Sequence, residues 1–172
     1  MKKLLLLSAI IFSTSVFAQT DVFSAARSGD TKAIAQLYAL NADTINAENQ
    51  QGYTPLILAC YYNQTAVLEL LMQYKVALNE TPNSPTALQA ASYKGFKDCV
   101  KLLLDYGANP NIVDANGTSP LIYAVQFNHT EIVGLLLKKG ASVTYKDPNG
   151  FTAINYAENL GLTEILAMLK SN

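Results

Sequence analysis

Residues 54–71 read TPLILACYYNQTAVLELL, and residues 119–136 repeat the pattern as SPLIYAVQFNHTEIVGLL. In both stretches a hydroxyl residue is followed by Pro and Leu, an alanine stands five residues after the start, and an Asn stands nine residues after it. A second apolar run then follows. Agreement at so many separate positions indicates an internal repeat, and this repeat decides the fold.

Five copies of the pattern can be aligned along the chain, spaced by 32 to 34 residues. The copies start at Thr20, Thr54, Thr86, Ser119 and Thr152. Five residues after each start stands an alanine: Ala25, Ala59, Ala91, Ala124 and Ala157. Nine residues after each start stands a Gly or an Asn: Gly29, Asn63, Gly95, Asn128 and Gly161.

Each repeated position has a physical reason. A Thr or Ser followed by Pro is typical of the start of a helix, and the small alanine allows a second helix to approach closely. Gly or Asn can adopt the left-handed backbone conformation that ends a helix, and the next aliphatic run predicts a second helix. Gly107 and Gly140 should end that helix, and the sequences ending at Gly117 and Gly150 predict hairpin turns before the next copy.

One such pair of helices cannot bury its own apolar face, so the copies must stack into a solenoid. The pattern therefore predicts an all-α repeat fold of about five helix-turn-helix units. We expect repeats at about residues 19–48, 49–80, 81–113, 114–146 and 147–172, which form a single domain over residues 19–172. The first and last copies are atypical and are expected to act as caps.

The chain resembles the ankyrin repeat family in Gly52–Leu56, in residues 86–91, in Gly95 with residues 99–111, in residues 116–124 and in residues 129–141. The resemblance covers residues 20–172. It implies an ankyrin solenoid with hairpin fingers along one edge, and a surface of fingers and first-helix ends that binds other proteins. The junction from Lys75 to Pro85 departs from the pattern, since it lacks both the Gly and the Asp-x-x-Gly finger and has two prolines. We expect an irregular finger there, either by drift in a loop or for a special binding role.

Residues 1–18 have the layout of a secretory signal peptide: two lysines, a short apolar run, and small residues before Gln19. The expected cleavage lies between Ala18 and Gln19, and the lysine-led segment looks bacterial. The sequence thus predicts a periplasmic protein, with secretion as the alternative location and an uncleaved anchor as the alternative to cleavage. After cleavage we expect no membrane contact and a monomer.

The charge of the mature chain argues against nucleic acid as a partner. Without Lys2 and Lys3, ten basic side chains remain against thirteen acidic ones, a formal charge of −3. Binding to phosphate groups requires a basic face.

Catalytic motifs are missing from the sequence, so no enzyme activity, cofactor or metal site is predicted. His129 is the single histidine, and it stands where ankyrin repeats commonly carry a structural histidine. Cys60 and Cys99 are the two cysteines. Both are expected to be buried thiols that act as small apolar residues, and a disulfide between adjacent repeats is the alternative.

The expected binding surface follows from the ankyrin pattern. The residue before each Thr or Ser, and the two residues after the paired small residues, should point outward. Six of the twelve such positions in the second to fifth copies are aromatic, against 9% of the whole chain. From these twelve we predict eight partner-binding residues: Tyr53, Tyr61, Tyr62, Tyr93, Lys94, Gln126, Phe127 and Phe151. The alternative is that these rings shelter one another and only stabilise the solenoid.

These patterns favour a non-catalytic module in the periplasm that binds another protein. One alternative is an inhibitor or immunity protein that blocks an exported toxin or hydrolase. Another is an accessory factor of an oxidative-stress enzyme such as a catalase, which the resemblance to exported bacterial ankyrin proteins implies. The partner's identity does not follow from the sequence.

Overall fold

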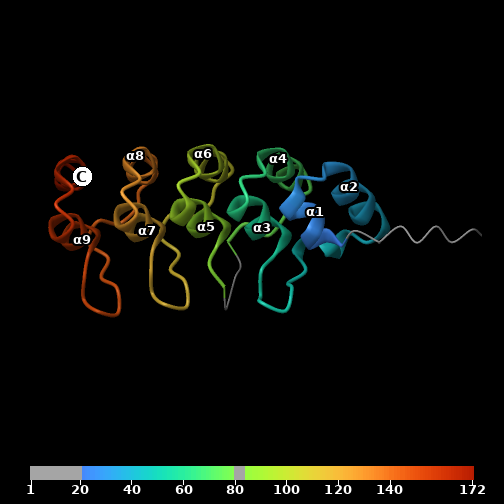
Figure 1. Ribbon diagram of the computed structural model, residues 1–172, viewed down its shortest axis with the longest axis horizontal. Coiled ribbons are helices and arrows are strands. Elements are labelled where there is room, and N and C mark those ends of the chain that lie inside the picture. Colours follow the sequence, from blue (N-terminus) through green and yellow to red (C-terminus); the bar gives the residue numbers. More distant parts are fainter. Residues whose placement is uncertain (1–20, 80–83) are drawn as a thin grey trace, which may run out of the picture.

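The helices of the chain alternate between two layers and stand in a row (Figure 1). The computed structural model describes residues 21–79 and 84–172, and within these ranges the chain forms ten α-helices, one 3-10 helix and no strand. This confirms the predicted all-α repeat fold. The inner layer contains α1 (Val22–Ser28), α3 (Pro55–Tyr61), α5 (Ala87–Lys94), α7 (Pro120–Gln126) and α9 (Ala153–Asn159). The outer layer contains α2 (Thr31–Leu40), α4 (Thr65–Gln73), α6 (Lys97–Asp105), α8 (Thr130–Lys138) and α10 (Thr163–Lys170).

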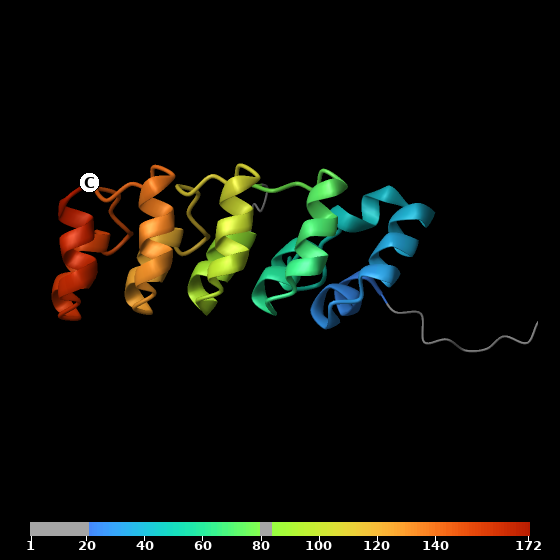
Figure 2. The same cartoon turned by 90° about the horizontal axis from the view of Figure 1, so that it is seen from above.

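Neighbouring copies pack through the inner helices, because α3 contacts both α1 and α5, and α7 contacts both α5 and α9. Seen from above, the outer helices lie side by side in the same order (Figure 2). The 3-10 helix η1 (Ala42–Asn46) follows α2 and contacts α3. The connecting loops project from the inner layer, on the side away from the outer helices (Figure 1).

The inner helices begin where the repeated hydroxyl residue caps them. In the second to fifth copies its side chain accepts a hydrogen bond from the backbone amide three residues on, as Thr54 does from Ile57. The first copy corrects the sequence prediction. Thr20 lies outside the described residues, and the cap of α1 is Asp21, which accepts from the amide of Ser24 at 2.7 Å. A carboxylate caps well because it also interacts favourably with the positive end of the helix dipole.

The small-residue and helix-ending positions of the repeat are both confirmed. All five repeated alanines have 0% of their surface exposed, so each inner helix is closely covered. The five repeated Gly and Asn residues have φ between 55 and 83°, in the left-handed region. Asn63 and Asn128 therefore take the same backbone conformation as the glycines at the matching positions.

The outer helices contribute a column of leucines to the core. Leu71, Leu103, Leu136 and Leu169 each have at most 1% of their surface exposed. Burying one such side chain stabilises the fold by about 1.5–3 kcal/mol. Because the inner helices of adjacent copies pack on one another, this core extends continuously from copy to copy and is built only when the copies stack.

The second copy ends differently from the third and fourth. Gly107 and Gly140 follow α6 and α8 with φ of 93 and 81°, whereas Lys75 takes this place after α4 with φ of 57°. The predicted irregular finger begins here, but residues 80–83 fall outside the described part. On their far side, Ser84 Oγ donates a 2.7 Å hydrogen bond to the carbonyl oxygen of Gly52 in the preceding finger.

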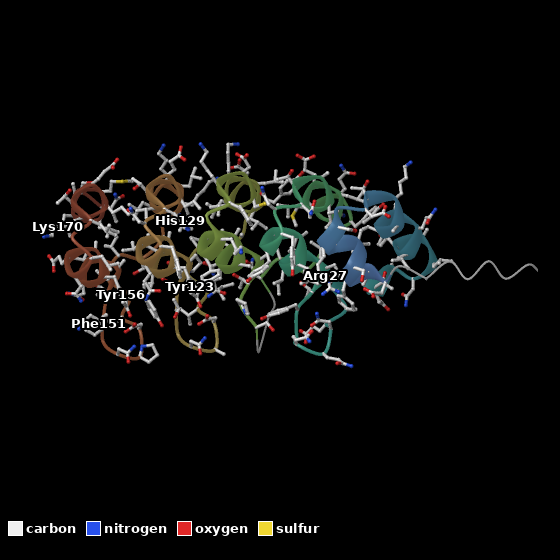
Figure 3. The ribbon with its side chains drawn as sticks, viewed as in Figure 1. Arg27, Tyr123, His129, Phe151, Tyr156 and Lys170 are labelled. Carbon is white, nitrogen blue, oxygen red and sulfur yellow. The ribbon has the colours of Figure 1, made fainter. Side chains whose placement is uncertain are left out.

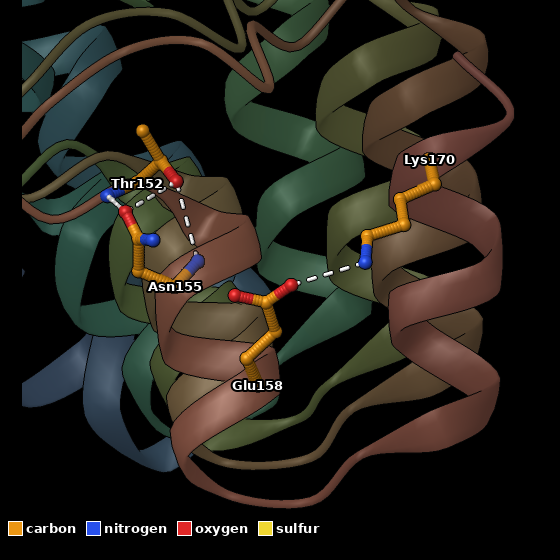
Figure 4. A network of polar contacts seen from close by, with 4 residues as sticks. All are labelled: Thr152, Asn155, Glu158 and Lys170. Carbon is orange, nitrogen blue, oxygen red and sulfur yellow. Dashed lines mark hydrogen bonds and ion pairs between the residues drawn. The ribbon is translucent and has the colours of Figure 1, made fainter.

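The last copy holds its two helices together with polar contacts (Figure 4). Thr152 and Asn155 form a capping box at the start of α9, and Lys170 Nζ on α10 lies 3.0 Å from Glu158 Oε1 on α9. Residues 1–18 and the expected cleavage between Ala18 and Gln19 lie outside the described residues. In the part of the chain that is described, no helix is long and apolar enough to cross a membrane.

Candidate functional site

A groove of about 400 Å³ runs between the finger loops and the inner helices of the second and third copies. Its floor is made by α3 and α5, and its walls by the loops before them and by one side chain from each of α1 and α7. The lining residues are Arg27, Asn49, Gln51, Tyr53, Ile57, Leu58, Tyr61, Tyr62, Pro85, Gln89, Ala90, Tyr93 and Tyr123. Five of the thirteen are tyrosines.

Four of the predicted binding residues, Tyr53, Tyr61, Tyr62 and Tyr93, meet in this groove. Lys94 borders it, with Nζ 4.7 Å from the centre of the Tyr61 ring. Phe127 extends the surface toward the fourth copy, because its ring packs edge-on against Tyr93 with 4.6 Å between centroids. The structure thus brings six of the eight residues together.

The other two predicted residues lie elsewhere. Gln126 is half-buried at the end of α7, beside the Tyr156 hydroxyl. Phe151 is exposed on the last finger, where its ring contacts Tyr156 with 5.7 Å between centroids (Figure 3). Neither side chain lines the groove.

Sequence reasoning missed five polar or aromatic lining residues: Arg27, Asn49, Gln51, Gln89 and Tyr123. Arg27 stands seven residues after the start of the first copy, the same place as Tyr61 and Tyr93 in theirs. Arg27 thus occupies an outward position of the repeat, but it lies in the atypical first copy, outside the second to fifth copies for which binding residues are predicted. Tyr123 and Gln89 lie at helix positions other than these outward positions, so the repeat pattern carried no signal for them.

The rings of the groove are only partly covered. Between 39% and 48% of the surface is exposed at Tyr61, Tyr62, Tyr93 and Phe127. Edge-on contacts between Tyr61 and Tyr62, and between Tyr93 and Phe127, fix the ring orientations. The surface therefore presents pre-arranged aromatic area with hydroxyl groups at its edge.

The fingers of the fourth and fifth copies, next to this surface, are fastened by paired carboxyl and phenol groups. In the finger of the fourth copy, which precedes α7, Asp114 Oδ1 accepts hydrogen bonds from the amides of Asn116 and Thr118. Its Oδ2 accepts a hydrogen bond from the Tyr123 hydroxyl at 2.6 Å. Burial, followed by the hydrogen bond to Asp114, raises the pKa of Tyr123 to about 12. The finger is therefore held at both its turn and its base.

The last finger repeats this arrangement with Asp147 and Tyr156. Asp147 Oδ1 accepts hydrogen bonds from the amides of Asn149 and Phe151, and Oδ2 accepts one from the Tyr156 hydroxyl at 2.6 Å. The hydrogen bond from Tyr156 lowers the pKa of Asp147, and the same contact raises the pKa of Tyr156. Figure 3 shows Tyr123 and Tyr156 at corresponding places in neighbouring copies.

Gln89 of the third copy forms hydrogen bonds to the finger of the fourth copy. Its Nε2 donates to the carbonyl oxygen of Thr118 at 2.7 Å and to that of Ile112 at 3.2 Å. Since Gln89 is fully buried and lines the groove, it joins the floor of the site to the adjacent finger. The floor of the groove and the finger of the fourth copy are thereby held at a fixed separation.

His129 has a structural environment. Its Nε2 lies 3.2 Å from the carbonyl oxygen of Tyr93 in the preceding copy. A carbonyl oxygen only accepts, so Nε2 carries the hydrogen. Gln64 does the same two copies earlier, where its Nε2 lies 2.9 Å from the carbonyl oxygen of Arg27. Both side chains bind the end of an inner helix in the preceding copy, which fits the structural role expected for His129.

The two cysteines lie in adjacent copies behind the groove. Both side chains are buried, as predicted, and both thiols are free in the structure. Burial raises the pKa of the Cys60 thiol, whereas a hydrogen bond from Cys60 lowers the pKa of Cys99. Within residues 21–79 and 84–172, no group of three or more His, Cys, Asp or Glu side chains is arranged to hold a metal ion.

Comparison with known proteins places these features in a family. A family model described as ankyrin repeats in three copies matches residues 22–114 and 107–172. The tyrosine-protein kinase HTK16 of Hydra vulgaris is 30% identical over 122 residues, which is 69% of this chain and 16% of the kinase. Ankyrin repeat and SAM domain-containing protein 6 of Rattus norvegicus is 31% identical over 66% of this chain and 13% of that protein.

A third, shorter relative also matches this chain over only part of its own length. Ankyrin repeat domain-containing protein 63 of Homo sapiens is 30% identical over 102 residues, or 56% of this chain and 27% of that protein. The chain therefore spans less than a third of the length of each of these relatives.

Proposed function

Because the chain belongs to the ankyrin repeat family, we propose that it is a non-catalytic module that binds another protein in a bacterial periplasm. The observation that carries this proposal is the gathering of two pairs of half-exposed rings at the groove, Tyr61 with Tyr62 and Tyr93 with Phe127. Aromatic side chains are frequent anchors of protein interfaces, and exposed apolar clusters often mark an interaction site.

The mechanism of binding is rigid surface complementarity. The finger of the second copy borders the groove, and its turn is fixed by Asn49 Oδ1, which accepts hydrogen bonds from the amides of Gln51 and Tyr53. Gln89 in the floor of the groove also binds the adjacent finger of the fourth copy. Ordering a flexible side chain on binding costs about 0.5–1.5 kcal/mol. Rings that are already packed against one another lose less freedom than this, so more of their contact energy contributes to affinity.

The periplasmic location rests on the sequence of residues 1–18. If the segment is a signal peptide, the protein recovered from the periplasmic fraction begins at Gln19 and its intact mass lacks residues 1–18. Recovery of the full-length chain from the cytosol would refute this location.

The binding role is tested by replacing Tyr61, Tyr62 and Phe127 by Ala and measuring melting temperature and partner capture separately. The partner is captured from periplasmic extract and identified by mass spectrometry. Tyr106→Ala serves as a matched control, because Tyr106 is an exposed tyrosine at the end of the outer helix α6.

We expect the triple variant to lose the partner that the wild type and Tyr106→Ala retain. If the triple variant melts at a lower temperature yet captures the partner as before, the rings only stabilise the solenoid. The identity of the partner then separates a general scaffold from an inhibitor of a toxin or hydrolase and from an accessory of a catalase.

A further inference from the structure

The charges of the molecule are distributed unevenly between the groove and the rest of the surface. In the described residues four ion pairs occur, and none of them borders the groove. Three join side chains of the outer layer and its loops: Lys97 with Glu131, and Asp105 with both Lys101 and Lys139. The fourth, Lys170 with Glu158, lies at the C-terminal end (Figure 4). Lys97, Lys101 and Lys139 of the outer layer are thus paired with acids, whereas Lys32, Lys75 and Lys138 form no ion pair within the described residues.

The groove has the opposite character. Arg27 is the one charged side chain among the described residues that line it, and no carboxylate does. Lys94 stands at the border over the Tyr61 ring. Neither cation takes part in an ion pair in residues 21–79 and 84–172. The neighbouring carboxylates are occupied, since Asp21 caps α1 and Asp114 fastens its own finger.

The two cations reach the tyrosines from the helices on either side of α3. Arg27 lies in the last turn of α1 and Lys94 ends α5, with α3 between these helices. Because Lys94 Nζ lies over the Tyr61 ring of α3, its charge is about one helix spacing from α1, about 8–10 Å. An extended chain rises about 3.3 Å per residue and covers this distance in about three residues. Tyr61 and Tyr62 lie between, at the end of α3.

We propose that the groove binds an extended acidic segment of a protein, with two carboxylates about three residues apart that pair with Arg27 and Lys94. The side chains between them, Pro or an aliphatic residue, lie on Tyr61, Tyr62 and Tyr93. Arg27 offers a planar fork that accepts a carboxylate in two parallel hydrogen bonds, and Lys94 offers a point charge. This inference rests on the proposed function, because it names the chemistry of the partner for the same surface.

The test uses fluorescein-labelled ten-residue peptides with two glutamates fixed at separations of three to eight residues. The other positions are drawn from Pro, Leu, Ala and Gln. Parallel sets carry two glutamines or two lysines instead of the glutamates. Binding is measured by fluorescence polarisation with protein expressed from the complete 172-residue sequence, at low and at moderate salt.

We expect the glutamate set to bind at least tenfold tighter than the glutamine set, with an optimum at a separation of about three. Arg27→Gln and Lys94→Gln should each weaken binding about five- to tenfold, and added salt should weaken it further. Lys138→Gln is the matched control, because Lys138 is exposed on α8 away from the groove. Arg27→Gln leaves the fold intact, since Gln64 binds the backbone carbonyl of Arg27 and not its side chain.

Equal affinity for glutamate and glutamine peptides overturns the proposal, and so does an effect of Arg27→Gln and Lys94→Gln no larger than that of Lys138→Gln. Failure of every peptide to bind overturns it as well. In each of these cases the protein-binding role stands or falls separately, on whether the triple ring variant loses its captured partner.

Discussion

The Tyr123 hydroxyl on α7 donates a 2.6 Å hydrogen bond to Asp114 Oδ2, nine residues earlier in the finger loop. The other oxygen of Asp114 holds the turn of the same finger through two backbone amides. One carboxylate therefore connects the turn of the finger to the helix that follows it. The same geometry recurs between Tyr156 and Asp147, so this hydrogen bond is a repeated structural feature of the fourth and fifth copies.

Removing this hydroxyl should destabilise the domain. A hydrogen bond to a charged group contributes about 1.5–3 kcal/mol net, and because Tyr123 is half-buried we expect Tyr123→Phe to cost about 1–2 kcal/mol. For a domain of this size that lowers the melting temperature by a few degrees, about 2–4 °C per kcal/mol. Tyr74→Phe is the control, since Tyr74 stacks on Tyr38 and its hydroxyl makes no hydrogen bond within the described residues. Equal melting temperatures for both variants would contradict the fastening role.

Alkaline pH should weaken the same contact. The folded state holds the pKa of Tyr123 at about 12, above its ordinary value of 10.0, so folding favours the neutral phenol. The resulting stability is fully present below pH 10 and is lost as the pH rises from 10 toward 12. Chemical denaturation between pH 8 and 12 should show a steeper loss for the wild type than for Tyr123→Phe. Parallel curves would show that Tyr123 does not titrate with folding.

Lys75 has a left-handed backbone conformation, which destabilises the second copy relative to the third and fourth, where a glycine takes this place. A non-glycine residue in the left-handed region costs about 1–2 kcal/mol, while glycine costs about 0.4–1 kcal/mol through the unfolded state. Lys75→Gly should therefore stabilise the domain, by up to about 1 kcal/mol in urea denaturation. Gly140→Ala is the reciprocal change: a Cβ there meets no atom within 4 Å, so its expected loss of about 1 kcal/mol reports backbone strain alone. A loss of stability in Lys75→Gly would refute this account.

The environment of His129 predicts which replacement it tolerates. His129→Gln should keep nearly full stability, because Gln64 already makes the equivalent contact to the preceding copy. His129→Ala leaves the Tyr93 carbonyl without this partner and should cost about 1 kcal/mol. Gln64→Ala is the parallel test two copies earlier. The structural role is wrong if His129→Ala and His129→Gln unfold at the same denaturant concentration.

The repeat register was predictable from the sequence because its determinants are local. A hydroxyl cap such as Thr54, a buried alanine such as Ala91 and a left-handed residue such as Asn128 each follow from rules that operate within one helical turn. The left-handed Lys75 was not predictable, because lysine has no preference for that conformation. In the first copy Asp21 is the cap instead, because its carboxylate accepts the hydrogen bond from the amide of Ser24.

The candidate site was predictable only in part. The outward positions implied by the resemblance to ankyrin repeats identified Tyr61, Tyr62 and Tyr93, which all lie at the ends of inner helices. The walls of the groove depend on contacts between copies, such as that of Gln89 with Thr118, 29 residues away. No local pattern encodes such a contact, so the fixed separation of floor and finger emerges only from the folded chain.

The central claim is that a protein partner binds on the groove side of the solenoid, and site-specific photo-cross-linking tests it most directly. A photoreactive benzoylphenylalanine is placed at Tyr62, at Phe127 or at Tyr106, and cells are irradiated before the protein is purified. We predict a cross-linked partner from positions 62 and 127 and none from position 106, on the outer layer. A partner that cross-links from position 106 but from neither groove position would contradict the claim.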